Sequence, residues 1–277
     1  MRSHASSALL AVSVIIAGGL QVSCSTETGP QPGSPAFLWN AAKSNFAAQD
    51  YVKTAENLDR IVASENEYTA RAQSWLLVLT SGMIRGYMDF ADGLETGIRA
   101  KKSDPGNFRK YISNSRATAG RHSLHFAETF MKFQKGKDDP IPLAFDYPRG
   151  SAIPVAELTK AMNGMPLQPT ELESGQKRAL ERAILLETCR AVGAADDTAK
   201  AAELFKSGDV KISRATFLTA MGHSLYEQSQ LYTPNKMDDP SKVKMFASLA
   251  SEALKGVPES KQTKELVAKI QKAAVKK

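Results

Sequence analysis

The 277-residue chain is poor in cysteine and lacks the short motifs that mark several large enzyme classes. Its two cysteines, Cys24 and Cys189, allow at most one disulfide, which excludes a fold held together by a disulfide framework. The sequence contains no G-x-S-x-G, no P-loop and no G-x-G-x-x-G pattern. The usual signals of a serine hydrolase, a nucleoside triphosphatase and a dinucleotide-binding enzyme are therefore absent.

Long apolar runs are also missing, and the longest uncharged apolar stretch is residues 8–20, ALLAVSVIIAGGL. A transmembrane helix needs about 20 apolar residues, so this stretch is short for a membrane span. It follows a weakly basic start and precedes small residues, which is the order found in a secretory signal peptide. We therefore expect residues 1–23 to be a signal peptide and the mature chain to be exported.

The residues after that stretch read QVSC, residues 21–24, and a polar segment rich in glycine and proline follows them. They resemble the bacterial lipobox, although Gln21 stands where that family has an aliphatic residue. The resemblance implies that Cys24 carries a lipid anchor, that residues 24–35 form a flexible tether, and that the protein faces the periplasm from the outer membrane. The alternative is ordinary signal cleavage near Ser23, which leaves Cys24 as a free thiol or as half of a disulfide.

A moderate excess of basic residues gives the whole chain a formal charge of +7. Removing residues 1–23 lowers this charge to +6, because that segment holds Arg2 and no acidic residue. The basic residues are not interleaved with aromatic residues as they are in nucleic-acid sites. We therefore expect a solvated basic surface and no nucleic-acid partner.

From residue 35 onward the apolar positions recur at steps of three and four, which predicts helices and an all-α fold. An internal repeat appears when the chain is shifted by 36 residues. The pattern W-x11-Y-x3-A-x2-L then occurs twice, with these residues in the two copies: Trp39, Tyr51, Ala55 and Leu58, then Trp75, Tyr87, Ala91 and Leu94. A repeat of this length is typical of stacked helical hairpins.

These copies resemble the tetratricopeptide repeat (TPR), in which a tryptophan, an aromatic near the turn and a small residue hold two helices together. The resemblance implies a TPR-like solenoid of helical hairpins over residues 36–135, with packing roles for Trp39 and Trp75. It also implies a non-catalytic module that binds a protein or peptide of the cell envelope. The copies are degenerate, since the Leu-Gly pair that follows the tryptophan in the family is absent from both.

Residues 136–175 differ from the helical parts on either side because they contain six prolines. Proline interrupts helices, so we expect an irregular crossover in this segment, with one short helix at VAELTKAM. Helical periodicity resumes over residues 176–277, which predicts a C-terminal helical region packed on the same body.

The strongest candidates for metal ligands lie on two predicted helices, and they are His122, His125 and Glu128, then His223 and Glu227. Their spacings of three and four residues place each group on one helix face, and imidazole and carboxylate suit several transition metals. The set matches neither H-E-x-x-H nor the E-x-x-H pair of helical carboxylate sites. We therefore expect ordinary polar helix faces, with no metal and no other cofactor.

The loop LAFDYPRG, residues 143–150, combines the aromatic residues Phe145 and Tyr147 with Arg149. Aromatic and arginine side chains are common at binding hot spots, so these three are candidate partner contacts. The alternative is that both rings fold back over the core. Cys189, in the apolar stretch ERAILLETCRAV, is expected to be a buried and unreactive helical thiol.

The sequence leaves three functions open. The first is a lipid-anchored scaffold or protein-binding module without catalysis, which requires exposed apolar or aromatic residues on one face of the hairpins. The second is an accessory lipoprotein of a solute-uptake system, which requires a cavity with a few convergent polar groups. The third is a metal-dependent helical enzyme, which requires His122 and His125 to lie near His223.

Replacing Cys24 by alanine tests the lipid anchor. Without the thiol no acyl chain can be attached, so Cys24→Ala should move from the detergent phase to the aqueous phase in detergent partitioning of cell extracts. Cys189→Ala is the matched control and should partition like the wild type. Unchanged membrane fractionation of Cys24→Ala would show that this residue is not the anchor.

Overall fold

The computed structural model describes residues 29–102 and 107–275, so the predicted signal peptide and Cys24 lie outside the described part of the chain. Within it the protein has ten α-helices, one short 3-10 helix and two three-residue strands. The all-α fold class predicted from the apolar periodicity is confirmed.

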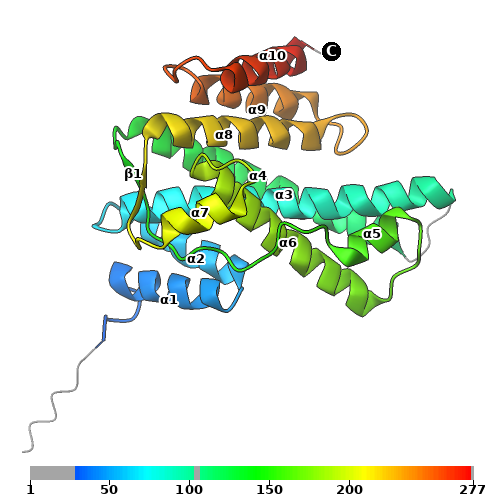
Figure 1. The fold of residues 1–277 in the computed structure, drawn as a ribbon, viewed down its shortest axis with the longest axis horizontal. Helices are drawn as coiled ribbons and strands as arrows, with labels where there is room; N and C mark the ends of the chain where they lie inside the picture. The colour runs from blue at the N-terminus through cyan, green and yellow to red at the C-terminus, as the bar shows by residue number, and fades with distance from the viewer. Residues whose placement is uncertain (1–28, 103–106, 276–277) are drawn as a thin grey trace, which may run out of the picture.

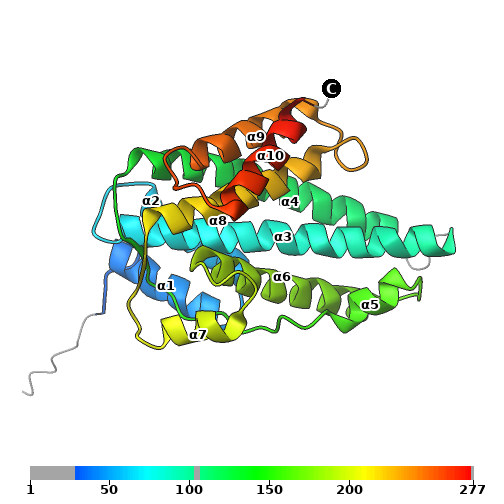
Figure 2. The same cartoon turned by 45° about the horizontal axis from the view of Figure 1, so that its top comes forward.

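Helix α3 (Thr69–Lys101) runs through the middle of the molecule (Figures 1 and 2). Every residue from 74 to 84 of this helix is buried, so it is enclosed on all sides. Helices α4 (Phe108–Lys135) and α6 (Pro169–Ala191) pack along it, and elements from both halves of the chain also contact it. The fold is therefore built around one long central helix.

The N-terminal hairpin consists of α1 (Pro35–Ala47) and α2 (Tyr51–Val62). Ser34 caps α1 by accepting a hydrogen bond from the backbone N–H of Phe37, and proline occupies the first helical position. Asp50 caps α2 in the same way, with the backbone N–H three residues later as the donor. The first copy of the sequence repeat falls on this hairpin.

The second copy of the repeat does not form a hairpin. Its residues Trp75, Tyr87, Ala91 and Leu94 all lie in the single helix α3. The segment between Trp75 and Tyr87, LLVLTSGMIRG, has no proline, and its Ser81-Gly82 pair, which could mark a turn, lies within the helix. Both glycines of the segment pack against α6. A repeat of a solenoid contacts mainly its neighbours, whereas α3 contacts both halves of the chain. The solenoid arrangement is therefore not confirmed.

Helices α3 and α6 approach each other so closely that two glycines are required at their contact. A Cβ atom on Gly82 would lie 2.5 Å from Cα of Ile184, and one on Gly86 would lie 2.7 Å from Cα of Leu180. The obstructing atoms belong to the backbone, so they cannot move aside without moving the helix. The two glycines therefore set the distance between α3 and α6.

The proline-rich segment is an irregular crossover that contains two short regular elements. Strand β1 (Ile141–Leu143) pairs antiparallel with β2 (Val210–Ile212), and three residues are too few for an alternating pattern to reveal a strand in the sequence. Helix α5 (Ala156–Met162) is the short helix predicted at VAELTKAM. Helix α6 begins inside this segment, earlier than expected, because Gln168 and Glu171 form a capping box at its start.

The C-terminal part forms a layered stack. Its elements are α7 (Thr198–Phe205), α8 (Arg214–Ser229), the 3-10 helix η1 (Gln230–Tyr232), α9 (Pro240–Ala253) and α10 (Lys261–Val275). Helices α8, α9 and α10 lie on one another, with α8 nearest to α3 (Figures 1 and 2). One apolar cluster extends from α1 to α10, and a second, smaller one lies where α3, α4, α5 and α6 meet.

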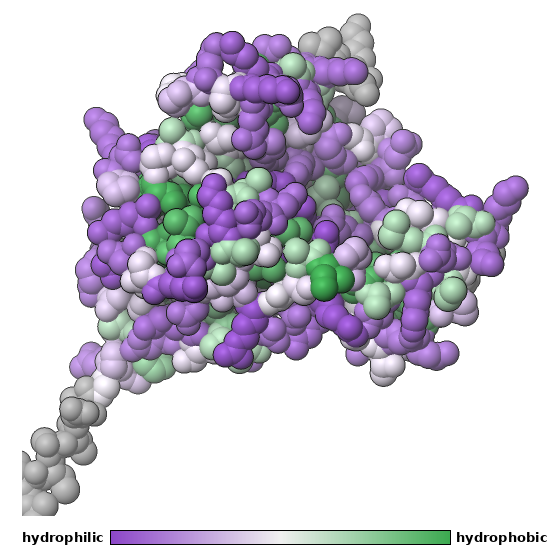
Figure 3. Space-filling model, in the orientation of Figure 1, coloured by the Kyte–Doolittle hydropathy of each residue, from purple (hydrophilic) through white to green (hydrophobic). Residues whose placement is uncertain are grey.

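The face of the molecule shown in Figure 3 is mostly hydrophilic, with separate apolar patches instead of one continuous apolar groove. The exposed large apolar side chains of the described residues are spread along the chain, from Phe37 to Ile153, Met165 and Met245. In the ranges that the structure describes, no helix combines the length and the apolar composition that a membrane span needs.

Gly82→Ala should destabilise the protein because its methyl group would collide with the backbone of Ile184. We expect a loss of about 1–3 kcal/mol in the free energy of unfolding, measured by chemical denaturation. This loss should occur although alanine is more favourable than glycine in a helix by about 1 kcal/mol. Gly93→Ala in the same helix is the control. Its new methyl group would meet Leu158 Cδ2 at 3.1 Å, the end of a flexible side chain, so this variant should be neutral or slightly stabilised. Equal stability of the two variants would contradict the close contact.

Candidate functional site

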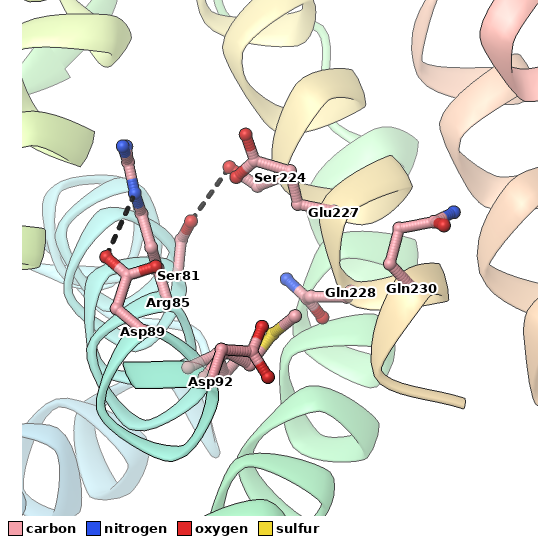
Figure 4. Close-up of a pocket in the computed structure, with 10 residues that line it drawn as sticks. Ser81, Arg85, Asp89, Asp92, Ser224, Glu227, Gln228 and Gln230 are labelled. Atoms are coloured by element: carbon pink, nitrogen blue, oxygen red, sulfur yellow. Dashed lines mark hydrogen bonds and ion pairs between the residues drawn. The ribbon is translucent and has the colours of Figure 1, made fainter. Parts of the chain in front are cut away.

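A polar pocket of about 220 Å³ lies between α3, α8 and η1 (Figure 4). Its wall consists of Ser81, Ile84, Arg85, Met88, Asp89, Asp92, Ser224, Glu227, Gln228 and Gln230. Most of these side chains are polar or charged, although the helices around them bury an apolar core. The pocket is therefore the candidate functional site.

Helix periodicity brings the polar side chains of the pocket together. Ser81, Arg85 and Asp89 follow one another at steps of four along α3, so their side chains share one face. Ser224 and Gln228 are four residues apart on α8, and they project toward that face (Figure 4). Two facing helix surfaces thus form the pocket.

The carboxylate of Glu187, on α6, is the centre of a buried charge network beside the pocket, and its side chain is 1% exposed. Its Oε1 lies 2.8 Å from Nη1 of both Arg85 and Arg190. Its Oε2 accepts hydrogen bonds from Ser81 at 2.9 Å and from Ser224 at 2.8 Å. Both oxygens are fully occupied, and the network joins α3, α6 and α8.

The two arginines decide the ionisation of Glu187. Burial raises the pKa of a carboxyl group, but the charges of Arg190 and Arg85 outweigh burial and hold the pKa of Glu187 below its ordinary value. Arg190 also donates to both carboxylate oxygens of Glu227 at 2.9 Å. Burial, together with the negative charge of Glu187, raises the pKa of Glu227. Two arginines and two glutamates thus form a charge-balanced unit.

Two further carboxylates from α3 line the pocket, and they differ in how their charge is compensated. Asp92 lies 2.6 Å from Nζ of Lys236 and 3.4 Å from Arg116. Asp89 has only long ion pairs, at 3.9 Å to Arg85 and at 3.7 Å to a guanidinium of α6, and its carboxylate accepts no hydrogen bond from the described residues. Burial raises the pKa of Asp89. Asp89 is therefore the carboxylate of the pocket with free acceptor capacity.

The amide of Gln228, which projects from α8 toward α3, is the unusual group of the site (Figure 4). The residue is only 2% exposed. Neither its Oε1 nor its Nε2 has a hydrogen-bond partner within the described ranges. A buried polar group left without a partner costs about 1–3 kcal/mol of stability. The amide therefore offers a donor and an acceptor to a molecule that enters the pocket.

The candidate metal ligands of α4 have other partners. His125 Nε2 lies 2.6 Å from Asp59 Oδ1, and this hydrogen bond raises the pKa of His125. His122 stacks on Tyr87 with 6.0 Å between the ring centroids, and burial lowers its pKa. Glu128 is exposed. The two histidines therefore contact α2 and α3.

The candidate ligands of α8 lie in a different environment. Burial, with the charge of Arg190, lowers the pKa of His223 to about 4. Glu227 is paired with the same arginine. Among the described residues there is no group of three or more His, Cys, Asp and Glu side chains that could hold a metal ion. The fold does not bring the two predicted sets of ligands together.

The aromatic residues predicted as partner contacts point inward. Phe145 is 6% exposed and stacks on Trp75 with 5.5 Å between the ring centroids. Tyr147 is half-buried, and its hydroxyl donates to the carbonyl oxygen of Thr198 at 2.9 Å. Arg149 is exposed. Both rings thus cover the core, because an aromatic cluster around Trp75 provides the surface on which they pack. Of the three predicted contact residues, only Arg149 is exposed enough to contact a partner.

Cys189 is a buried thiol of α6, as the apolar stretch around it predicts. The hydroxyl of Tyr147 lies 3.6 Å from its Sγ. Burial raises the pKa of the thiol, which keeps the sulfur protonated near neutral pH. This environment does not support a nucleophilic role.

The sequence carried part of the signal for the pocket. Ser81 and Glu187 each interrupt a strongly apolar helical run, LLVLTSGMI and AILLETCRAV, and a polar residue in such a run needs a buried partner. The two residues are each other's partners, but 106 positions separate them, so the pairing could not be read from the chain. Gln228 lies in the mixed stretch SLYEQSQL and gives no comparable signal.

Comparisons with known proteins add no assignment to this pocket. The chain matches no protein-family model, no curated protein and no solved structure. The chemistry of the pocket must therefore be inferred from its own residues.

Glu187→Gln should destabilise the protein strongly, because it removes the only close carboxylate of Arg85 and leaves Arg190 with Glu227 alone, while both guanidinium groups stay largely buried. We expect a loss of about 3–5 kcal/mol in the free energy of unfolding near neutral pH. Because the pKa of folded Glu187 is lowered, its stabilisation is present above the ordinary value of 4.5 and is lost as the pH falls through the folded pKa. The difference in stability between wild type and variant should therefore shrink in acid.

Glu203→Gln is the control for this experiment. Glu203 is 70% exposed and pairs with Lys206 on the surface, so its replacement should change the free energy of unfolding by less than about 0.5 kcal/mol. If Glu187→Gln has an equally small effect, or if its effect does not depend on pH, the network does not have the assigned role.

Proposed function

We propose that the protein is an exported, non-catalytic binding protein that holds a small polar solute in the pocket between α3 and α8. The observation that carries this proposal is the amide of Gln228, which is buried in the pocket wall without a hydrogen-bond partner among the described residues. A bound solute with one donor and one acceptor would supply both missing bonds.

The volume of the pocket suits a small molecule. At about 220 Å³ it exceeds the roughly 150 Å³ of an engineered cavity that binds benzene. On that scale it accommodates roughly nine non-hydrogen atoms. It is smaller than the pockets of about 300–1,000 Å³ that hold drug-sized ligands. The proposed solute is therefore of the size of a small metabolite.

The charge network beside the pocket favours binding over catalysis. A hydroxyl nucleophile needs a neighbouring base that accepts its proton. The hydroxyls of Ser81 and Ser224 do point at Glu187, but both oxygens of that carboxylate are occupied and its lowered pKa makes it a weak base. These groups hold the wall of the pocket in place, and we assign no catalytic residue.

The proposed location follows from the N-terminal segment. The lipobox-like residues around Cys24 favour a lipid anchor at the outer membrane, with the helical body in the periplasm. An anchored body with a solute pocket fits an accessory lipoprotein of a solute-uptake system, and its partner would be another envelope protein of that system.

A scaffold function has less support from the helical body. It requires exposed apolar or aromatic residues on one face of the hairpins. Of the four aromatic residues of the N-terminal hairpin, Trp39, Phe46 and Tyr51 are buried and Phe37 alone is exposed. The pocket is therefore the better-supported site of binding.

Gln228→Met tests the site, because methionine keeps the length of the side chain and removes the amide. This variant should gain about 1 kcal/mol or more in the free energy of unfolding, since an unpaired buried polar group is lost. It should also lose solute binding. Stability is measured by chemical denaturation, and binding by calorimetric titration after a thermal-shift screen of amines, sugars, polyols, amino acids and organic acids.

Gln176→Met on α6 is the matched control. Its Nε2 donates to Ser115 Oγ at 3.0 Å, so this variant should lose about 0.5–1.5 kcal/mol of stability and bind solutes like the wild type. The proposal fails if Gln228→Met is destabilised to the same extent. It also fails if no class of compound in the screen binds the wild-type protein.

A further inference from the structure

Acidic side chains outnumber basic ones among the described residues that line the pocket. Asp89, Asp92 and Glu227 contribute three carboxylates to the wall, against the single guanidinium of Arg85. Arg85 donates to Glu187 at 2.8 Å, so its charge is already matched. The charge that suits a ligand is therefore decided by which of the three carboxylates lacks a close basic partner.

The three carboxylates are not equally available to a ligand. Glu227 accepts from Arg190 through both oxygens at 2.9 Å. Asp92 accepts from Lys236 at 2.6 Å and pairs with a second basic side chain. The ion pairs of Asp89 are longer, at 3.7 and 3.9 Å, and its carboxylate accepts no hydrogen bond within the described ranges. Asp89 is therefore the acceptor that a positively charged donor would find unoccupied.

The amide of Gln228 needs a different kind of partner from the one that Asp89 needs. Its Oε1 needs a donor and its Nε2 needs an acceptor. A hydroxyl group satisfies both, because it donates to Oε1 and accepts from Nε2. A carboxylate only accepts and an ammonium group only donates, so each of them leaves one amide atom without a partner.

We propose that the pocket binds a small amino alcohol, whose ammonium group pairs with Asp89 and whose hydroxyl group pairs with the amide of Gln228. Both residues line the pocket, Asp89 from α3 and Gln228 from α8, so a ligand that pairs with both bridges the two helices. This proposal rests on the proposed binding function and names its ligand class. The volume limits the ligand to roughly nine non-hydrogen atoms.

Serinol and glycerol are matched probes for the ammonium group. They have the same carbon skeleton and differ only in the group on the central carbon, which is an amino group in serinol and a hydroxyl in glycerol. Near neutral pH, wild-type protein should bind serinol at least about tenfold more tightly than glycerol in calorimetric titration, because the ammonium group of serinol forms an ion pair with Asp89 whereas glycerol offers only a neutral hydroxyl donor. Isopropylamine, which has the ammonium group without a hydroxyl, should also bind more weakly than serinol.

Two variants test which residue binds the ammonium group of the ligand and which binds its hydroxyl group. Asp89→Asn should reduce the affinity for serinol to about that for glycerol and change the affinity for glycerol much less. Gln228→Met should weaken the binding of both. Asp146→Asn removes an exposed carboxylate outside this pocket and should change neither affinity. The ratio of the two affinities is measured on one protein sample, so a moderate loss of stability in a variant does not alter it.

The possible outcomes separate the ligand class from the binding function. If glycerol or glycerate binds as tightly as serinol, and this binding is lost in Gln228→Met, the amino-alcohol class is overturned and the solute-binding function stands. A serinol affinity that Asp89→Asn does not change also overturns the class. If no probe and no compound of the wider screen binds, the binding function itself is overturned.

Discussion

The burial of Glu187 between two arginines is the interaction on which the rest of the structure depends. A carboxylate removed from water loses several kcal/mol of hydration, and it is tolerated only where charge and hydrogen bonds replace that water. Arg85 and Arg190 supply the charge, and two serine hydroxyls supply the remaining bonds. Because these groups come from α3, α6 and α8, satisfying one carboxylate fixes three helices relative to one another.

The pocket follows from this arrangement. Where α3 and α6 meet, glycines allow the backbones to touch and no space is left. Where α3 and α8 meet near the network, polar side chains take the place of apolar ones, and the gap between them is not filled. Helical proteins commonly place ligand sites between helices in this way. The unpaired amide of Gln228 lowers the stability of the protein, because a buried polar group without a partner is unfavourable.

Local features of the chain were predictable, and contacts between distant segments were not. The helix start at Ser34 and the short helix at VAELTKAM depend on neighbouring residues, so the sequence alone was sufficient. Trp75 and Tyr87 matched the first repeat in spacing, but that spacing fits one continuous helix as well as a hairpin. The glycines between them could mark a turn, and only the packing of α6 shows that they serve a helix contact. Asp89 and Gln228 line the same pocket because α8 packs on α3. Helical periodicity shows which face of a helix is buried, but it does not show which helix packs against that face.

The order of residues in α3 links the helix contact to the charge network. Ser81 precedes Gly82 and Arg85 precedes Gly86, so each polar residue that reaches Glu187 stands next to a glycine that touches α6. The complementary pattern on α6 is Glu187-x-x-Arg190. The pair S-G-x-x-R-G and E-x-x-R, separated by on the order of 100 positions, is thus a compact signature. A single turn of α3 and one of α6 thus serve both the close backbone contact and the charge network.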